Sequence, residues 1–404
     1  MIRKQGIIMK KKVRNLSALV VAGLTLYATN GFSVPAIEMD YTCPIGKEKF
    51  RSIDYSPQCP TNKFVMFKNK FTKEELEKYE KIINSKEYKA VPKTSPKEYY
   101  LGRFYEMAGG FSDKEIGETY YKAYRAQINW NSENTNILKE SLTKGISYLE
   151  KSLPMENKSE FPWSLAYLYI SNKEFDKANA LVEKQDKNIH LERIANFYYS
   201  VSDVEKSKEN YYGYDYMDFD KESIDKKTKK EFREKALYYL QAVIKKNKGH
   251  YSEKELFRLV DLYKSLGNEK AIDEVFSKAP SEYWSLIVSY YLDEPIGSIG
   301  DVYDGKNLAT ENDLKKALSY ADKLVKMISK NNGADKIQYN LSIILKAETE
   351  RRLGKFEEAS KTLSKINITD IKDTIYRYDF ERLKELTEKK DSSVREYTPL
   401  PIMY

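Results

Sequence analysis

From Lys97 onward, apolar residues recur every three to four positions, the spacing of one face of an α-helix. Proline is absent from residues 163–279 and again from 296–398, so long helices can run without a break. The pattern predicts helix pairs at 97–108 with 113–127, 161–171 with 174–185, and 253–266 with 269–278, and a further pair within 340–366. Two more pairs, 188–201 with 230–246 and 281–292 with 312–330, are each split by an insertion, and single helices are expected at 136–153 and 369–390.

Small residues mark the points where the helices of a pair should approach closely. Ala347 and Ala359 stand twelve residues apart on either side of Gly354, and Ala166 and Ala178 repeat that spacing. Glycine readily adopts the left-handed conformation that ends a helix, so Gly354 suits the turn. This arrangement, two alanines twelve residues apart with a turn between them, is called the repeat frame here. It resembles tetratricopeptide-type helical repeats.

The spacing of the frame is irregular, because Ala166 and Ala347 are 181 residues apart and this is no multiple of the usual ~34. In the pair at 253–278, Val260 and Ile272 replace the two alanines. The predicted fold class is therefore all-α: an irregular tetratricopeptide-like α-solenoid over residues 97–390, with a small non-helical, disulfide-closed N-terminal head.

The first 33 residues have the composition of a secretory signal peptide. A basic stretch ending at Arg14 precedes an apolar run from Leu16 to Tyr27, and small residues follow before Val34. The run has 12 residues, whereas a membrane-spanning helix needs about 20. We expect an exported protein, periplasmic or extracellular, with no membrane span once the signal is removed; a retained anchor is the alternative.

The distribution of charge argues against nucleic-acid binding. The chain carries +8, but residues 1–33 hold six basic residues and no acidic one, which leaves +2 for the remainder. The remaining charges alternate in sign along the helices, as on solvated faces. No basic stripe of the kind that binds nucleic acid is visible.

Residues 34–71 form a cysteine-bearing head that does not have a helical pattern. Phe64–Phe67 is a short apolar run expected to be one strand of a small hairpin. Thr72 should begin a helix that continues to about Lys89, with Glu75 completing a capping box, and a linker should follow up to residue 96. Residues 391–404 are expected to be a loose tail.

Cys43 and Cys59 are the only cysteines, and each is followed by a proline. Each Cys-Pro motif resembles the first half of a zinc knuckle, but Gly46 and Asn62 stand where the second cysteine ligands would be. Two thiolates alone cannot complete a tetrahedral zinc site. In an oxidising compartment a disulfide is the favoured interpretation. Free or redox-active thiols and a metal site are the alternatives.

The head and its continuation are similar to an uncharacterised bacterial family in which a cysteine-bearing segment precedes tetratricopeptide-type helices. The resemblance covers roughly residues 41–130 and lies in the pattern Cys59-Pro60-x-Asn62-x-Phe64-Val65, then Lys68, then Phe71-x-x-Glu74-Glu75-Leu76. It implies a fold but no activity, cofactor or catalytic residue.

No catalytic constellation is visible in the sequence. The two histidines, His190 and His250, lack partners at the spacing of a metal site or triad, and each is expected at a surface or helix end. Nucleotide-binding fingerprints are also missing. Paired acids of a helical-toroid glycoside hydrolase cannot be recognised from sequence, so this enzyme class stays an alternative.

If the first helix of each pair lines a groove, the resemblance places mostly aromatic and acidic side chains on it. The candidate binding residues are Tyr99, Arg103, Trp163, Tyr167, Asn196, Tyr199, Phe257, Asp261 and Lys264. An insertion at 210–220 adds Tyr214 and Tyr216, interleaved with acids that could contact a sugar, a peptide or a cation. The alternative for each ring is simple core packing.

These observations lead to one functional expectation. The chain is interpreted as a non-catalytic protein-interaction or assembly module of the bacterial cell envelope, which binds a protein or peptide partner in an aromatic-lined groove. It should need no cofactor or metal. The alternatives are an envelope glycan-binding protein and the helical-toroid hydrolase.

Overall fold

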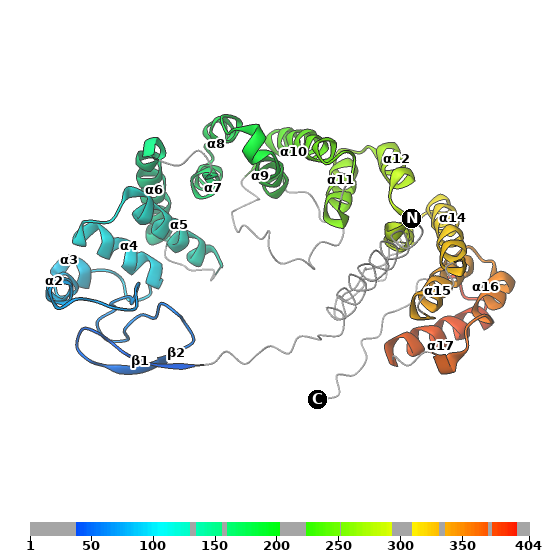
Figure 1. The fold of residues 1–404 in the computed structure, drawn as a ribbon, viewed down its shortest axis with the longest axis horizontal. Helices are drawn as coiled ribbons and strands as arrows, with labels where there is room; N and C mark the ends of the chain where they lie inside the picture. The colour runs from blue at the N-terminus through cyan, green and yellow to red at the C-terminus, as the bar shows by residue number, and fades with distance from the viewer. Residues whose placement is uncertain are drawn as a thin grey trace, which may run out of the picture. The chain divides into compact units, whose positions relative to one another are not determined.

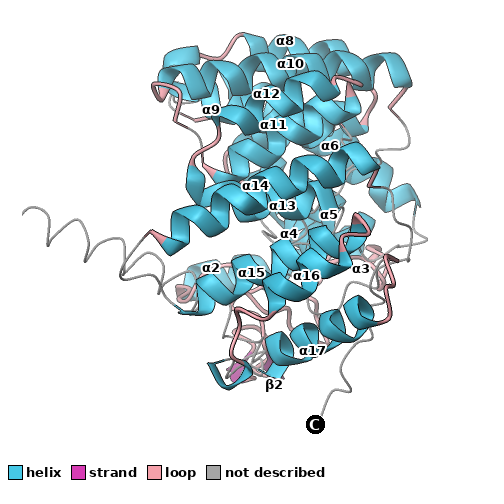
Figure 2. Ribbon diagram, turned by 90° about the vertical axis from the view of Figure 1, so that its right-hand side faces the viewer, coloured by secondary structure: helices cyan, strands magenta, loops and turns pink. Residues whose placement is uncertain are grey.

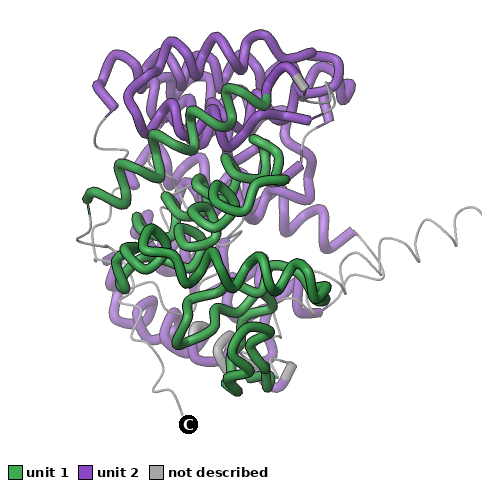
Figure 3. The backbone as a smooth tube through the Cα atoms, turned by 90° about the vertical axis from the view of Figure 1, so that its left-hand side faces the viewer, with its two compact units in different colours: residues 1–152 green, residues 153–404 purple. Residues whose placement is uncertain are grey.

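The computed structural model describes residues 38–129, 135–155, 160–202, 224–250, 252–292, 309–330, 336–370 and 374–393. It confirms the all-α class, with helices as the dominant elements (Figure 2), and a disulfide closes the small head. The chain divides into two compact units, residues 1–152 and 153–404 (Figure 3). The expected signal peptide, Tyr214, Tyr216 and most of the tail lie outside the described residues.

In its described residues, the first unit contains a hairpin followed by five helices, and their arrangement can be followed in Figure 1. Strands β1 (Met39–Thr42) and β2 (Lys49–Ser52) pair antiparallel. The helices are α2 (Lys73–Ile83), α3 (Lys86–Lys89), α4 (Lys97–Ala108), α5 (Asp113–Asn129) and α6 (Thr135–Ser152).

The hairpin prediction was wrong in position. Phe64–Phe67 is not a strand, and only Val65 forms an isolated bridge, with Gln58. The reason is that Phe64 is fully buried, and its ring packs edge-on against Phe104 of α4. Core packing on the helices therefore places this run, rather than strand pairing.

The helix expected over residues 72–89 is two helices. Thr72 and Glu75 form the predicted capping box of α2. The chain then leaves the helix at Asn84, and the Ser85 side chain accepts a hydrogen bond from the Tyr88 backbone N–H to begin α3. A serine at this point offers a new N-cap, so the break has a local cause.

The predicted disulfide is confirmed, since Cys43 and Cys59 are bonded and both are fully buried. Asn62, which stands where a zinc knuckle would have its second thiolate, instead donates its side-chain N–H to the Ile45 carbonyl at 2.8 Å. The head is therefore held by a covalent link and a side-chain hydrogen bond, and its buried residues join the core formed by α2 to α6.

The second unit is a row of helices in which each packs mainly on its neighbours in the chain. They are α7 (Trp163–Ser171), α8 (Phe175–Glu183), α9 (Lys187–Val201), α10 (Lys226–Lys246), α11 (Glu253–Ser265), α12 (Glu269–Lys278), α13 (Trp284–Leu292), α14 (Glu311–Ser329), α15 (Lys336–Arg352), α16 (Phe356–Leu363) and α17 (Thr374–Glu388). All four alanines of the repeat frame are fully buried, and Gly354 has the expected positive φ of 73°. This packing is that of an α-solenoid.

The repeat is longer than one helix pair. The close-contact residues Ala166, Val260 and Ala347 are separated by 94 and 87 residues. They belong to the short pairs α7–α8, α11–α12 and α15–α16, and the longer pairs α9–α10 and α13–α14 lie between them. Two alternating kinds of pair thus give a period of four helices, which explains why a single-pair period does not fit.

No helix in the described ranges combines the length and apolarity needed to cross a bilayer.

Candidate functional site on helices α8 and α10

The predicted groove tyrosines are core residues. Tyr99, Tyr167 and Tyr199 are each 4% exposed. Trp163, which is half-buried, stacks on Tyr167 with ring centroids 5.8 Å apart. These rings hold neighbouring helices together and offer little surface to a ligand.

The structure brings three of the predicted residues together between α9 and α11, with Arg258 as a partner that the sequence did not reveal. The Tyr199 hydroxyl donates to Asp261 Oδ2 at 3.0 Å, and the Arg258 guanidinium lies 4.7 Å from the Tyr199 ring centroid while donating to Asn196 Oδ1. Arg258 and Asp261 are almost fully buried. On the same helix, Phe257 is half-buried and Lys264 is exposed.

Tyr99 and Arg103 belong to a charged cluster within the first unit. Tyr99 donates to Glu140 at 2.6 Å, Arg103 pairs with Glu106 at 2.9 Å, and Lys144 contacts both carboxylates, at 2.7 and 3.0 Å. Burial raises the pKa of Glu140, but hydrogen bonds from Tyr99 and Lys144 outweigh it, and the net shift is downward. Both acids are therefore held by cations.

One cluster type recurs three times and is called a brace here: a lysine and a tyrosine four residues apart on one helix, a tyrosine on the preceding helix, and an acidic acceptor. The lysine ammonium lies 5.1–5.3 Å from the centroid of the preceding helix's tyrosine, and the two rings stack 5.7–6.3 Å apart. The three braces are Lys144, Tyr148, Tyr120 and Glu106; Lys235, Tyr239, Tyr198 and Glu183; and Lys316, Tyr320, Tyr291 and Asp273.

In the second brace, three different side chains donate hydrogen bonds to one carboxylate. Glu183 accepts from Tyr198 at 2.9 Å, from Lys235 at 3.0 Å and from Tyr239 at 2.5 Å. Burial alone would raise the pKa of Glu183, but the hydrogen bonds from Tyr239, Lys235 and Tyr198 lower it to about 2. This carboxylate is ionised at neutral pH and joins α8, α9 and α10.

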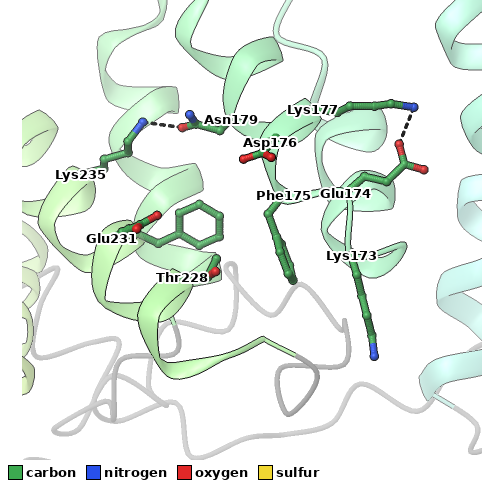
Figure 4. A pocket seen from close by; sticks show the side chains of 10 residues that line it. Lys173, Glu174, Phe175, Asp176, Lys177, Asn179, Thr228, Glu231 and Lys235 are labelled. Carbon is green, nitrogen blue, oxygen red and sulfur yellow. Dashed lines mark hydrogen bonds and ion pairs between the residues drawn. The ribbon is translucent and has the colours of Figure 1, made fainter.

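Two adjoining hollows open beside this brace, each of about 400 Å³, and together they are called the α8–α10 surface. Figure 4 shows the first, where Phe175 and the residues around it on α8 face Thr228, Glu231 and Lys235 of α10. The second shares Glu231 and Lys235 with the first. The residues lining the pair are Lys173, Glu174, Phe175, Asp176, Lys177, Asn179, Glu183, Thr228, Glu231, Phe232, Glu234, Lys235, Tyr238 and Tyr239.

The three braces share the residues that pack the helices together, but they differ at one position that faces solvent. The sequences are Lys144-Gly-Ile-Ser-Tyr148, Lys235-Ala-Leu-Tyr-Tyr239 and Lys316-Ala-Leu-Ser-Tyr320. The fourth position is exposed in all three, and it holds serine in two of them but Tyr238 in the second. Tyr238 is 66% exposed, so its ring does not serve core packing.

Sequence reasoning missed this site, although the signal was present. One five-residue motif begins at residues 144, 235 and 316, with separations of 91 and 81 residues. It consists of lysine, a small residue, an aliphatic residue, any residue and tyrosine. A search for periods well above ~34 would have found it. The departure at Tyr238 from an otherwise shared pattern would then have marked the position.

His190 lies at a helix end as expected, in the first turn of α9, but it is fully buried beside the Phe161 ring, whereas His250 is exposed. Within the described ranges, no three side chains of His, Cys, Asp or Glu are gathered as a metal site requires.

Fold and site together define a helical-repeat protein with a mixed charged and aromatic surface hollow. No family model, curated protein or solved structure matches the chain.

Proposed function

We propose that this protein is a non-catalytic binding module of the bacterial cell envelope, and that it holds a protein or peptide partner on the α8–α10 surface. The observation that carries the proposal is Tyr238: a large ring, 66% exposed, beside a hollow, at a position where both equivalent braces have serine. Exposed tyrosines at the edge of a concavity are typical of binding surfaces.

The acids of the braces have a packing role, which fits a binding module. A general acid or base works best with a pKa near the operating pH. The pKa of Glu183 is lowered to about 2, and Glu106 and Glu140 are both in contact with Lys144. Acids held in this way stabilise helix packing, and a hydrolase would need one carboxyl group that can donate a proton.

The disulfide supports the proposed location in the cell envelope. A buried disulfide such as Cys43–Cys59 persists in an oxidising compartment and is rare in the cytosol. The N-terminal signal peptide and the relation to tetratricopeptide repeats stay predictions. Cell fractionation tests the export directly, and recovery of the full-length chain in the cytosolic fraction would refute it.

A photo-crosslinking amino acid at residue 231 tests the binding proposal in living cells. Residue 231 lines both hollows, and Asn312 is the equivalent exposed position of the next brace, four residues before its lysine. We expect one dominant crosslinked polypeptide from position 231 and none from position 312. Equal capture at the two positions, or none at either, would contradict the proposal.

A further inference from the structure

We propose that the α8–α10 surface recognises a lysine or arginine side chain of a peptide segment, whose cation lies on the Tyr238 ring and between Glu231 and Glu234. This inference rests on the proposed function, because it names the chemical class of the partner held at the same surface.

Charge complementarity is the first argument. Five acids and three lysines line the α8–α10 surface. Lys177 pairs with Glu174 at 2.5 Å and Lys235 with Glu183 at 3.0 Å, so these two acids are neutralised locally. The three other acids, Asp176, Glu231 and Glu234, outnumber Lys173, the remaining lysine among the lining residues, and the surface favours a cationic ligand.

The existing partners of Glu231 and Glu234 are weak. Lys227 and Lys230 approach them at 3.9 Å along the exposed side of α10, and all four side chains are more than half exposed. Exposed pairs of this kind contribute about 0–1 kcal/mol. An incoming cation can therefore replace these contacts at little cost.

The aromatic face supplies the second argument. Inside the braces, a lysine ammonium repeatedly lies about 5 Å from a tyrosine ring centroid with a carboxylate beside it. Tyr238 has carboxylates nearby, and among the described residues the aromatic ring packed against it is that of Tyr239, nearly perpendicular and with centroids 5.1 Å apart. It thus offers the arrangement of a brace without the cation.

The third brace provides a matched negative control within the same chain. The positions equivalent to Glu231, Glu234 and Tyr238 are Asn312, Lys315 and Ser319. An acid is replaced by an amide, the second acid by a lysine, and the ring by a hydroxyl. In the first brace the equivalent positions hold Glu140, Thr143 and Ser147. The combination of two acids with an exposed aromatic ring is therefore particular to the second brace and is not required for the fold.

Ligand-observed NMR titration of the full chain tests the inference with two glycine–serine peptides, one carrying two arginines and the other citrulline at the same places. Citrulline keeps the shape of arginine and removes its charge. We expect the arginine peptide to bind about tenfold more tightly, and more weakly as salt is raised. Tyr238→Ser should weaken it about threefold, Glu231→Gln with Glu234→Gln about fivefold, and Ser319→Ala not at all.

Equal binding of the two peptides, no binding of the arginine peptide, or no effect of the variants at 231, 234 and 238 would overturn the inference. Thermal unfolding of each variant checks that it is folded, which the exposure of these side chains predicts. The proposed function is judged separately by crosslinking at residue 231, where the probe replaces one acid and leaves Glu234 and Tyr238 in place to hold the partner. Capture of a partner there without discrimination between the peptides would refute the cation preference alone.

Discussion

Tyrosine has two roles in this protein, and burial of the ring decides which. Tyr198 is fully buried, and its hydroxyl reaches a carboxylate, so ring and hydroxyl both serve packing. Tyr238 projects from the same group of helices into solvent. With 34 tyrosines in the chain, composition alone says nothing about which ring meets a ligand. Only the helix face on which a ring lies makes the distinction.

Glu183 gives a prediction at this scale, because its pKa is lowered from 4.5 to about 2 in the folded protein. A group with a depressed folded-state pKa stabilises the fold fully above its unfolded pKa and loses this contribution as pH falls through the folded one. The free energy of unfolding should therefore fall between about pH 4.5 and pH 2. Glu183→Gln should flatten this fall and cost about 1–3 kcal/mol at pH 7, because three hydrogen bonds lose their charged acceptor.

Chemical denaturation at several pH values measures both effects. Glu234→Gln on the same surface is the control, since Glu234 is exposed and takes part in no brace. An unfolding free energy whose pH dependence is the same in Glu183→Gln and in wild type would contradict the role given to Glu183.

The candidate groove residues show what sequence can and cannot predict about single side chains. The frame correctly identified Ala166 and Ala178 as close-contact points, because small residues at fixed spacing have one main use in a helix pair. The frame did not show that Tyr167, one position along, would be buried against Phe197 of α9. The disulfide was predictable because the chain has only two cysteines.

At the scale of the helices, a glycine allows two neighbouring helices to pack closely. Helices α5 and α6 meet at Gly117, where an added Cβ would lie 2.6 Å from Leu149 Cγ and 3.0 Å from its backbone nitrogen. Sequence predicted both helices but treated α6 as an extra one. The pairing depends on a glycine in mid-helix, and such a residue is equally typical of a weak point in a helix.

Gly117→Ala should destabilise the first unit by about 1–3 kcal/mol, although alanine is the better helix former, because the new methyl group overlaps Leu149. The combination with Leu149→Ala should cost less than the sum of the two single changes, since removal of the leucine side chain relieves the overlap. Urea unfolding of the three variants measures this coupling. Strict additivity, or stabilisation by Gly117→Ala alone, would show that the helices do not meet there.

For the whole molecule, the all-α fold class could be predicted from the sequence, but the four-helix period of the repeat could not. Helical spacing and the placement of prolines predict the all-α fold, because both act locally. The four-helix repeat depends on residues about 90 positions apart, such as Lys144 and Lys235, whose equivalence becomes clear once each lysine is seen over a tyrosine ring. The α8–α10 surface was missed for the same reason, since Tyr238 is unusual only in comparison with Ser147 and Ser319.

The central claim is that the second brace carries a binding surface that the scaffold does not need. The most direct test repeats the crosslinking from residue 231 in protein carrying Tyr238→Ser, the change that makes this brace like the other two. The account predicts that the yield of captured partner falls severalfold while the thermal unfolding curve stays that of wild type. Capture at the wild-type level would contradict the claim, and so would loss of the folded state, because Tyr238 would then belong to the scaffold.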